Sequence, residues 1–296
     1  MKNNLKSITV SMKGLIIGNC SIDNKNGIIH KGGPAVYQLP IFSALGAELD
    51  LLTSVDDEYV KTLSGFKNIY NLKTEMTTTF KFGVNSENER ILKLIQKPID
   101  YDFDIIPSMI FENSYNFVIF SGISGELEID FITKLINHLN SDNYILDLQS
   151  LVRKADENGN IIIKKIEMED LNKLPKINII KGSDVEINLS EYMEKNYEKD
   201  LDNNKILIET TNKGRIYYTN KTMNIFDFEI IPEKEIIDDT GSGDIFLACF
   251  SWMFIMNKDI KKAIKFAHKV SSDLLRVNGV SGYKEASKVI NKRLSI

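Results

Sequence analysis

The sequence contains few cysteines and histidines for a chain of 296 residues. Cys20 and Cys249 are its only cysteines, which is too few for a disulfide framework or a four-cysteine metal site. Scarce cysteine also fits a reducing compartment. The three histidines, His30, His138 and His268, lack the spacing of metal ligands. We therefore expect a cytoplasmic protein built without disulfides or a histidine-bound metal.

Long hydrophobic segments and an excess of basic charge are also absent. The longest uncharged apolar run in the later part of the chain is residues 245–256, which is too short to cross a bilayer. Lys and Arg number 37 and Asp and Glu number 41, giving a formal net charge of −4. A nucleic-acid binder needs a basic surface that displaces counterions. We therefore expect a small-molecule substrate and neither a membrane nor a nucleic-acid partner.

Two common nucleotide-binding motifs are missing as well. No Gly-x-Gly-x-x-Gly follows the first strand-like run, where the sequence reads GNCSID (18–23), so a dinucleotide-dependent oxidoreductase is disfavoured. No Gly-x-x-x-x-Gly-Lys-Ser/Thr occurs either, which argues against a P-loop. A nucleotide site in this chain would have to be built in another way.

Short apolar runs alternate with helical patterns along most of the chain. Residues 14–18 predict a buried strand, residues 34–45 a helix that starts at a proline and stops before Gly46, and residues 48–55 a second strand. Further strands are expected at 116–122, 143–148, 176–180, 205–210, 215–219 and 223–231, and helices at 126–139, 242–256, 260–276 and 283–293. This order predicts an α/β fold in three layers, α/β/α, with a mostly parallel sheet.

Two polar, alternating segments interrupt that order. Residues 21–31 and 77–96 read as exposed hairpins, the second with a turn near residues 85–88. We expect a single domain over residues 1–296 with a small β lid from about 21–33 and 74–98.

The most informative stretch is DDTGSGD, residues 238–244, which lies directly before an apolar helix. Gly241 and Gly243 leave backbone N–H groups unobstructed, and a helix N-terminus attracts anions. Asp244 would repel such an anion, so it needs another purpose. A carboxylate there could accept the proton of an attacking hydroxyl. The alternative is that Asp244 only caps the helix.

DDTGSGD resembles the Asp-x-Thr-Gly-Ala-Gly-Asp signature of the ribokinase (PfkB) family of carbohydrate and nucleoside kinases. The runs GNCSID and 32–58 are similar to the family's N-terminal strand, double-glycine turn and first helix. TTTF (77–80), DLQSLVR (147–153) and TTNKGRIYY (210–218) are most similar to runs of plant-type myo-inositol kinases.

The resemblance implies a ribokinase-like fold, ATP and Mg²⁺ as cofactors, and a set of site residues. These are Asp244, Gly241, Ser242 and Gly243 for catalysis; Asp23, Gly32, Gly33, Tyr37, Asp147 and Arg153 for the substrate; Thr211, Lys213, Gly214 and Gly279 for the nucleotide; and Glu186 for Mg²⁺ through water. We also consider a homodimer joined through the lid.

The chain departs from the family pattern at several positions. Tyr37 replaces an asparagine that often touches a sugar, and Ser183 replaces the asparagine of Asn-x-x-Glu. Glu209, Thr211 and Asp239 also differ from the usual residues. We therefore expect a kinase acting on a small polyol or sugar, inositol-like rather than ribose. A nucleoside kinase and a non-catalytic ligand-binding relative are the alternatives.

Overall fold

The computed structural model describes residues 12–84, 90–98, 100–174, 176–189, 191, 205–220, 222–277 and 283–294. Within these ranges nine strands form one sheet in the order β17-β16-β15-β14-β11-β9-β1-β4-β5. The strands are β1 Met12–Ile17, β4 Ala47–Thr53, β5 Asn68–Asn71, β9 Phe117–Phe120, β11 Tyr144–Asp147, β14 Ile177–Ser183, β15 Ile206–Thr210, β16 Arg215–Asn220 and β17 Thr222–Asp227. Neighbours from β5 to β15 are parallel, whereas β16 and β17 are antiparallel.

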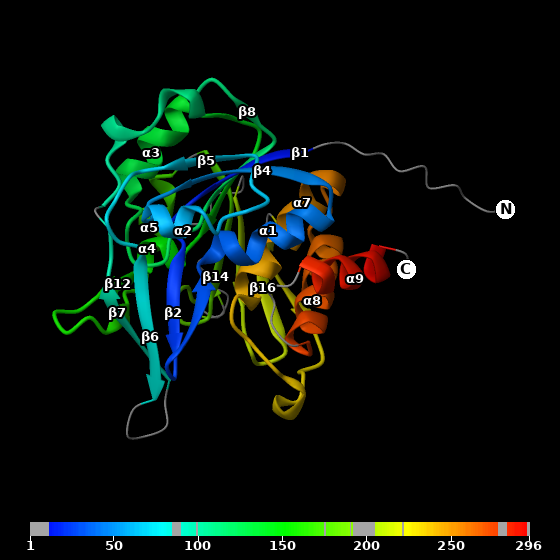
Figure 1. Ribbon diagram of the computed structural model, residues 1–296. Coiled ribbons are helices and arrows are strands. Elements are labelled where there is room, and N and C mark those ends of the chain that lie inside the picture. Colours follow the sequence, from blue (N-terminus) through cyan, green and yellow to red (C-terminus); the bar gives the residue numbers. More distant parts are fainter. Residues whose placement is uncertain are drawn as a thin grey trace.

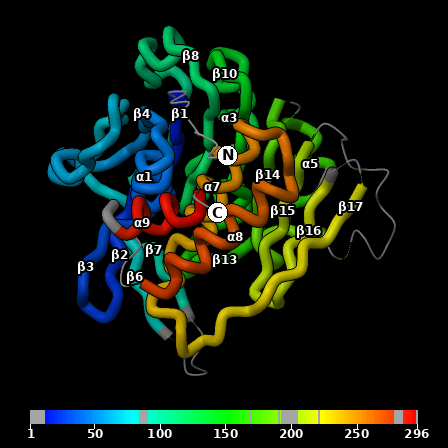
Figure 2. Tube along the Cα trace, turned by 90° about the vertical axis from the view of Figure 1, so that its right-hand side faces the viewer, coloured from blue at the N-terminus to red at the C-terminus, as the bar shows by residue number. Residues whose placement is uncertain are grey.

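Helices cover both faces of this sheet (Figure 1). One layer contains α1 Pro34–Ala44, α7 Ser242–Asn257, α8 Ile260–Leu275 and α9 Tyr283–Leu294, which Figure 2 shows together in front of the strands. The other face carries α3 Ile129–His138 and α5 Met168–Asn172. Each face of the sheet has its own hydrophobic core. In β1, Ile16 packs into the core shared with α1, α7, α8 and α9, whereas Leu15 and Ile17 pack into the core shared with α3 and α5. Side chains of a strand alternate between faces, so a continuous apolar run fills both cores, as the sequence predicts.

Apart from two hairpin regions described below, the remaining elements are short. They are α2 Asp57–Val60, α4 Gln149–Val152, β8 Ser114–Tyr115, β10 Asn140–Ser141, and the 3₁₀ turns η1 Phe103–Ile105, η2 Ser108–Ile110 and η4 Glu233–Glu235. The predicted three-layer α/β fold is confirmed, as are the antiparallel pair at the sheet's edge and the three C-terminal helices. No helix within the described ranges has the length and apolar character needed to span a membrane.

A separate four-stranded sheet, which we call the lid, projects from the main sheet (Figure 1). Its order is β3-β2-β6-β7, with β2 Ser21–Lys25, β3 Ile28–Gly32, β6 Thr78–Val84 and β7 Arg90–Gln96. Both predicted hairpins are present, and parallel pairing of β2 with β6 joins them. The predicted turn at 85–88 lies outside the described residues. The single-domain division and the lid homodimer stay predictions.

A further hairpin, which the sequence analysis did not predict, extends the lid. It consists of β12 Arg153–Ala155 and β13 Ile161–Ile163. The N–H of Leu94 in β7 donates to the carbonyl of Gly159 in its turn at 2.7 Å. The lid is thus joined to the segment that follows β11, which carries predicted site residues.

Candidate active site

A cavity of about 540 Å³ lies between the lid and the ends of the central strands. Most of the predicted site residues line it: Asp23, Gly33, Tyr37, Asp147, Arg153, Glu186, Gly241, Ser242, Gly243 and Asp244. Their segments are far apart in the sequence, so the fold brings them together. Gly32 does not line the cavity but lies directly beneath the Asp23 carboxylate.

The DDTGSGD loop closes one end of the cavity. Gly241 has a φ of 77° and forms the N-cap of α7, a left-handed conformation that glycine adopts without strain. The turn is held by Ser242 N–H donating to the Asp239 carbonyl and Ile245 N–H donating to the Gly241 carbonyl, at 3.3 and 2.9 Å. The first N–H groups of a helix have no partner inside it. The loop can therefore bind an anion.

Asp244 lies in the first turn of α7 and faces the cavity. The residue is half-buried, but its Oδ1 is shielded from solvent and has no hydrogen-bond partner among the described residues. Burial, reinforced by the charge of Asp147, raises the pKa of Asp244 to about 7, although Lys181 and Arg153 act in the opposite direction. A carboxylate with a pKa near 7 is suited to accept a proton from a hydroxyl.

Charged side chains from three neighbouring segments meet beside Asp244. Lys181 Nζ of β14 lies 3.7 Å from Asp147 Oδ1 of β11, and Arg153 Nη2 lies 3.5 Å from Glu186 Oε1. Burial raises the pKa of Asp147, with Lys181 opposing the shift. Burial works against ionisation of Glu186, but Lys181 and Arg153 lower its pKa. The sequence analysis did not identify Lys181, because its IKGS context reads only as a buried strand.

Another part of the cavity wall is built around Asp23 in the lid strand β2. Asp23 is buried and accepts a 2.7 Å hydrogen bond from Ser21 Oγ. A Cβ on Gly32 would lie 2.2 Å from Asp23 Oδ2, so the double glycine leaves space for this carboxylate. The phenol of Tyr37 experiences the charges of both Asp23 and Asp244, which, after burial, raise its pKa. Tyr37 thus shares the cavity with both carboxylates.

Apolar side chains form another part of the cavity wall. It is lined by Phe80, Phe82, Leu92, Ile161 and Ile163. The first three come from the lid strands β6 and β7, and the two isoleucines come from the β12–β13 hairpin. The sequence analysis missed this wall. A bound molecule would meet both carboxylates and hydrocarbon.

Three of the predicted nucleotide residues, Thr211, Lys213 and Gly214, do not line the cavity. Thr211 Oγ1 accepts from Lys213 N–H at 3.0 Å and donates to the Arg215 carbonyl at 2.8 Å, which closes the β15–β16 turn. Lys213 Nζ lies 3.4 Å from Asp184 Oδ2. Gly214 has a φ of 78°. Gly279 lies outside the described residues, and the nucleotide role of all four stays a prediction.

One lysine connects the lid to the DDTGSGD loop. Lys25 Nζ of β2 donates to Thr240 Oγ1 at 2.5 Å and lies 3.7 Å from Asp238 Oδ1. Its ammonium also lies 5.3 Å from the centre of the Phe82 ring. The lid is therefore tethered to the loop that would bind the anion.

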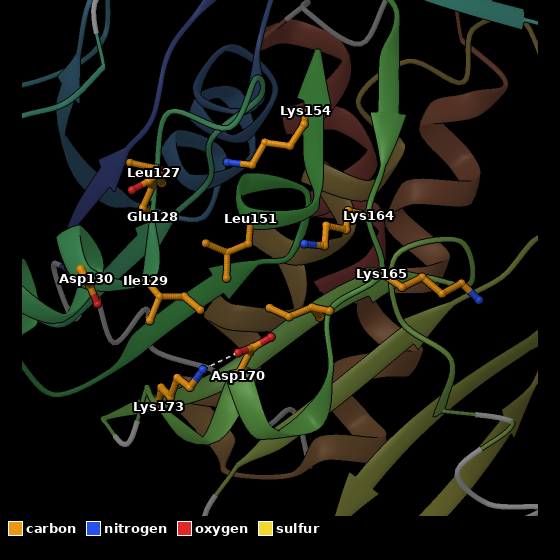
Figure 3. A pocket seen from close by; sticks show the side chains of 11 residues that line it. Leu127, Glu128, Ile129, Asp130, Leu151, Lys154, Lys164, Lys165, Asp170 and Lys173 are labelled. Atoms are coloured by element: carbon orange, nitrogen blue, oxygen red, sulfur yellow. Dashed lines mark hydrogen bonds and ion pairs between the residues drawn. The ribbon is translucent and has the colours of Figure 1, made fainter. Parts of the chain in front are cut away.

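A second cavity, of about 380 Å³, lies near the start of α3 (Figure 3). Figure 3 shows Lys173 paired with Asp170, while Lys165 directs its ammonium away from both. None of the predicted site residues lines this cavity. The cavity under the lid is therefore the candidate active site.

Comparison with known proteins identifies the family to which this chain belongs. A profile described as "pfkB family carbohydrate kinase" matches residues 127–285, more than half of the chain. The chain belongs to the pfkB family of carbohydrate kinases. The resemblance drawn from the sequence is thereby confirmed, and this pfkB kinase is a phosphotransferase. A search of curated proteins found no match.

Solved structures show the fold. A pyrophosphate-dependent kinase of the ribokinase family, complexed with a pyrophosphate analogue and myo-inositol, has a TM-score of 0.73 and 20% identity, covering 93% of this chain and 99% of that chain. Ribokinase from Thermotoga maritima has a TM-score of 0.69 and 14% identity, covering 96% and 100%. Arabidopsis thaliana ribokinase, complexed with ribose and ATP, has a TM-score of 0.65 and 15% identity, covering 95% of this chain and 99% of that chain. The pfkB kinase therefore has the ribokinase fold.

The lid tether gives a first testable prediction for this pfkB kinase. Lys25→Met removes the bond to Thr240 and the ion pair with Asp238, both of which are partly exposed. A partly exposed charged contact contributes about 1 kcal/mol. We expect the acceptor KM to rise about fivefold, with a smaller change in kcat, and donor hydrolysis without acceptor to increase. Steady-state kinetics with and without acceptor measure both effects.

Lys81→Met is the matched control, because Lys81 lies exposed on the lid strand β6. It removes the same charge from the same sheet without touching the DDTGSGD loop. An acceptor KM that is the same in both variants would show that the Lys25 contact does not hold the lid.

Proposed function

We propose that this chain is an ATP-dependent kinase that transfers the γ-phosphoryl group to a hydroxyl of a small polyol or sugar, with an inositol-like acceptor favoured. The observation that carries the proposal is that Asp23, Tyr37 and Asp244 line a single cavity together with the DDTGSGD loop. Asp23 accepts hydrogen bonds from acceptor hydroxyls, and Asp244 accepts the proton of the hydroxyl that reacts. The DDTGSGD loop binds the phosphate.

The reaction follows from these positions. The acceptor oxygen attacks the γ-phosphorus, its proton passes to Asp244, and the bond between the γ-phosphorus and the bridging oxygen breaks, releasing ADP. Backbone N–H groups of the loop stabilise the negative charge on the transferred group. The lid excludes water, which limits hydrolysis of the donor.

The residues present fit a hydrated Mg²⁺ bound with the donor. Asp147 Oδ2 is buried without a hydrogen-bond partner among the described residues, and Glu186 is a buried carboxylate nearby. No group of three or more His, Cys, Asp or Glu in the described ranges has the geometry of a metal site. Mg²⁺ commonly keeps water and phosphate ligands and uses one or two carboxylates. When bound, it supplies charge neutralisation of the phosphates.

The acceptor class follows from the shape of the pocket. Tyr37 offers one hydroxyl and a broad apolar ring where an amide would offer a donor and an acceptor. The wall formed by Phe80, Phe82 and Leu92 adds further hydrocarbon. A six-membered ring with C–H groups on its faces fits this space better than a furanose does. A nucleoside, whose base would stack on the same wall, is the alternative acceptor.

We predict a preference of at least tenfold in kcat/KM for myo-inositol over ribose, since pocket contacts of this size discriminate by about 10–200-fold. A coupled ADP-release assay with myo-inositol, ribose, cytidine and adenosine measures the ratio. Tyr37→Ala should reduce the preference. A preference for ribose that persists in Tyr37→Ala would contradict the prediction, and a preference for cytidine or adenosine would favour the nucleoside alternative.

Pyrophosphate is a second candidate for the donor. Lys181 and Arg153 place two cations in the cavity, whereas Thr211 and Lys213 are engaged in closing their own turn. Glu209, where the family usually has threonine, is buried and accepts from Leu189 N–H. One of the structurally similar proteins is described as pyrophosphate-dependent. Product formation from myo-inositol with ATP and with pyrophosphate, measured in parallel, separates the two donors.

A further inference from the structure

Lys181 is a buried lysine that faces the candidate active site. The residue is 6% exposed and lines the cavity beside the DDTGSGD loop. Lysine is rarely buried unless it is paired. Its nearest partner is Asp147 Oδ1 at 3.7 Å, which is an ion pair beyond hydrogen-bonding distance. Among the described residues, Lys181 Nζ makes no hydrogen bond, so its donors are available to a ligand.

The ammonium lies against the anion-binding loop. A Cβ placed on Gly243 would lie 2.8 Å from Lys181 Nζ, so the glycine makes room for this side chain. Gly243 is in the first turn of α7. The N-terminus of a helix repels a cation, and the ion pair with Asp147 holds Lys181 there against this repulsion. The arrangement becomes favourable when an anion binds between the ammonium and the helix.

Among the charged side chains of the site, Lys181 is the one best placed to bind an anion. Arg153 is already paired with Glu186. Asp147 Oδ2 and Asp244 Oδ1 are both buried without hydrogen-bond partners among the described residues. Lys181 is therefore the cation in this cavity whose hydrogen-bond donors remain for a ligand, among the described residues.

We propose that Lys181 is a catalytic residue that binds an oxygen of the transferred phosphoryl group, and that Asp147 is the positioning residue that holds the ammonium beside Gly243. This inference rests on the proposed kinase function. As the bond from the acceptor oxygen to phosphorus forms and the bond to the leaving group breaks, charge on the phosphoryl oxygens faces Lys181. Cations aimed at such oxygens stabilise the transition state. Lys181 keeps its proton throughout.

The competing explanation is that Lys181 only neutralises Asp147. Lys181→Met alone and Lys181→Met/Asp147→Asn together separate the two. If Lys181 is catalytic, both variants lose on the order of 10²–10³-fold in kcat. If Lys181 only neutralises Asp147, the double variant, which has no buried unpaired charge, has the same kcat as Asp147→Asn alone, and this equality overturns the proposal. The double variant also keeps the test usable if the single one fails to fold.

Binding measurements test Lys181 independently of turnover. Calorimetry compares ATP with ADP, and pyrophosphate with phosphate, in wild type and both variants. If Lys181 binds the transferable phosphoryl group, both variants lose the preference for ATP over ADP, or for pyrophosphate over phosphate, while their affinity for ADP changes little. Lys205→Met is the matched control, because Lys205 is a buried lysine that does not line the cavity; it keeps the wild-type preference.

The outcomes distinguish this inference from the function on which it rests. Wild-type protein that turns over neither donor with any acceptor contradicts the proposed function, and the binding preference then still tests Lys181. Active wild type together with a Lys181→Met variant of normal kcat and normal donor preference contradicts the role of Lys181 alone.

Discussion

Asp244→Asn is expected to abolish phosphoryl transfer while leaving donor binding intact. Removing a general base costs on the order of 10²–10⁴ in rate, and asparagine keeps the size of the side chain beside the anion-binding loop. Because the wild-type pKa is raised to about 7, kcat/KM of the wild type should increase as the pH rises through about 7. Single-turnover rates and a pH profile from 5 to 9 test both statements. Wild-type activity in the variant would show that Asp244 is not the general base.

The same substitution should stabilise the protein. The carboxyl ionises near pH 4 in the unfolded chain but near pH 7 in the folded chain. Between these values the folded state binds a proton that the unfolded state has lost, so stability falls as the pH rises and stays low above about 7. Each tenfold change in proton affinity is worth about 1.4 kcal/mol. Asp244→Asn should therefore gain on the order of 2–4 kcal/mol at pH 8 and less at pH 5.

Asp238, in the same loop, supplies a control, because its substitution is expected to change the folding stability in the opposite direction. Burial opposes its ionisation, but hydrogen bonds from Thr240 and the nearby Lys25 lower its pKa. Its ionised form stabilises the folded state above the unfolded pKa, so Asp238→Asn should destabilise the protein at pH 8. Thermal unfolding of both variants at pH 5 and 8 measures the pair of effects. A loss of stability in Asp244→Asn at pH 8 would contradict the buried, partly protonated base.

Features that are local in the sequence were predictable. The DDTGSGD loop lies within seven consecutive residues, and its glycines and following apolar helix indicate an anion site directly. Period and turn signals likewise predicted every strand of the main sheet except β5, the C-terminal helices and both lid hairpins. Such features depend on neighbouring residues, whose propensities can be read without knowing the tertiary structure.

Features that depend on distant packing were not predictable in the same way. Lys181 gains its significance from lying beside Gly243, which follows it by more than sixty residues. Glu209 is buried because it binds the backbone at Leu189. The β12–β13 hairpin did leave a signal, Asn158-Gly159 between the segments 153–155 and 161–163, a pair that favours hairpin turns. That signal could have located the isoleucines of the apolar wall.

Gly241→Ala is expected to disrupt the anion-binding loop. A Cβ at this position would lie 2.4 Å from ring carbons of Tyr37, and Tyr37 is itself buried, so one of them must move. The φ of 77° adds strain of about 1–2 kcal/mol for a residue other than glycine, and overpacking adds about 1–3 kcal/mol. We expect a loss of stability of about 2–5 kcal/mol and, in protein that still folds, a loss of at least about 10²-fold in kcat/KM, because the loop N–H groups are displaced.

Gly46→Ala separates the collision from the backbone strain. Gly46 follows α1 with a φ of 79°, and a Cβ there would meet nothing within 4 Å, so this variant carries only the strain of the left-handed conformation. It should lose about 1 kcal/mol and keep full activity. Adding Tyr37→Ala to Gly241→Ala makes room for the methyl group, so donor binding should recover in part. If Gly241→Ala and Gly46→Ala have equal stability and activity, the contact between Tyr37 and the loop does not shape the site.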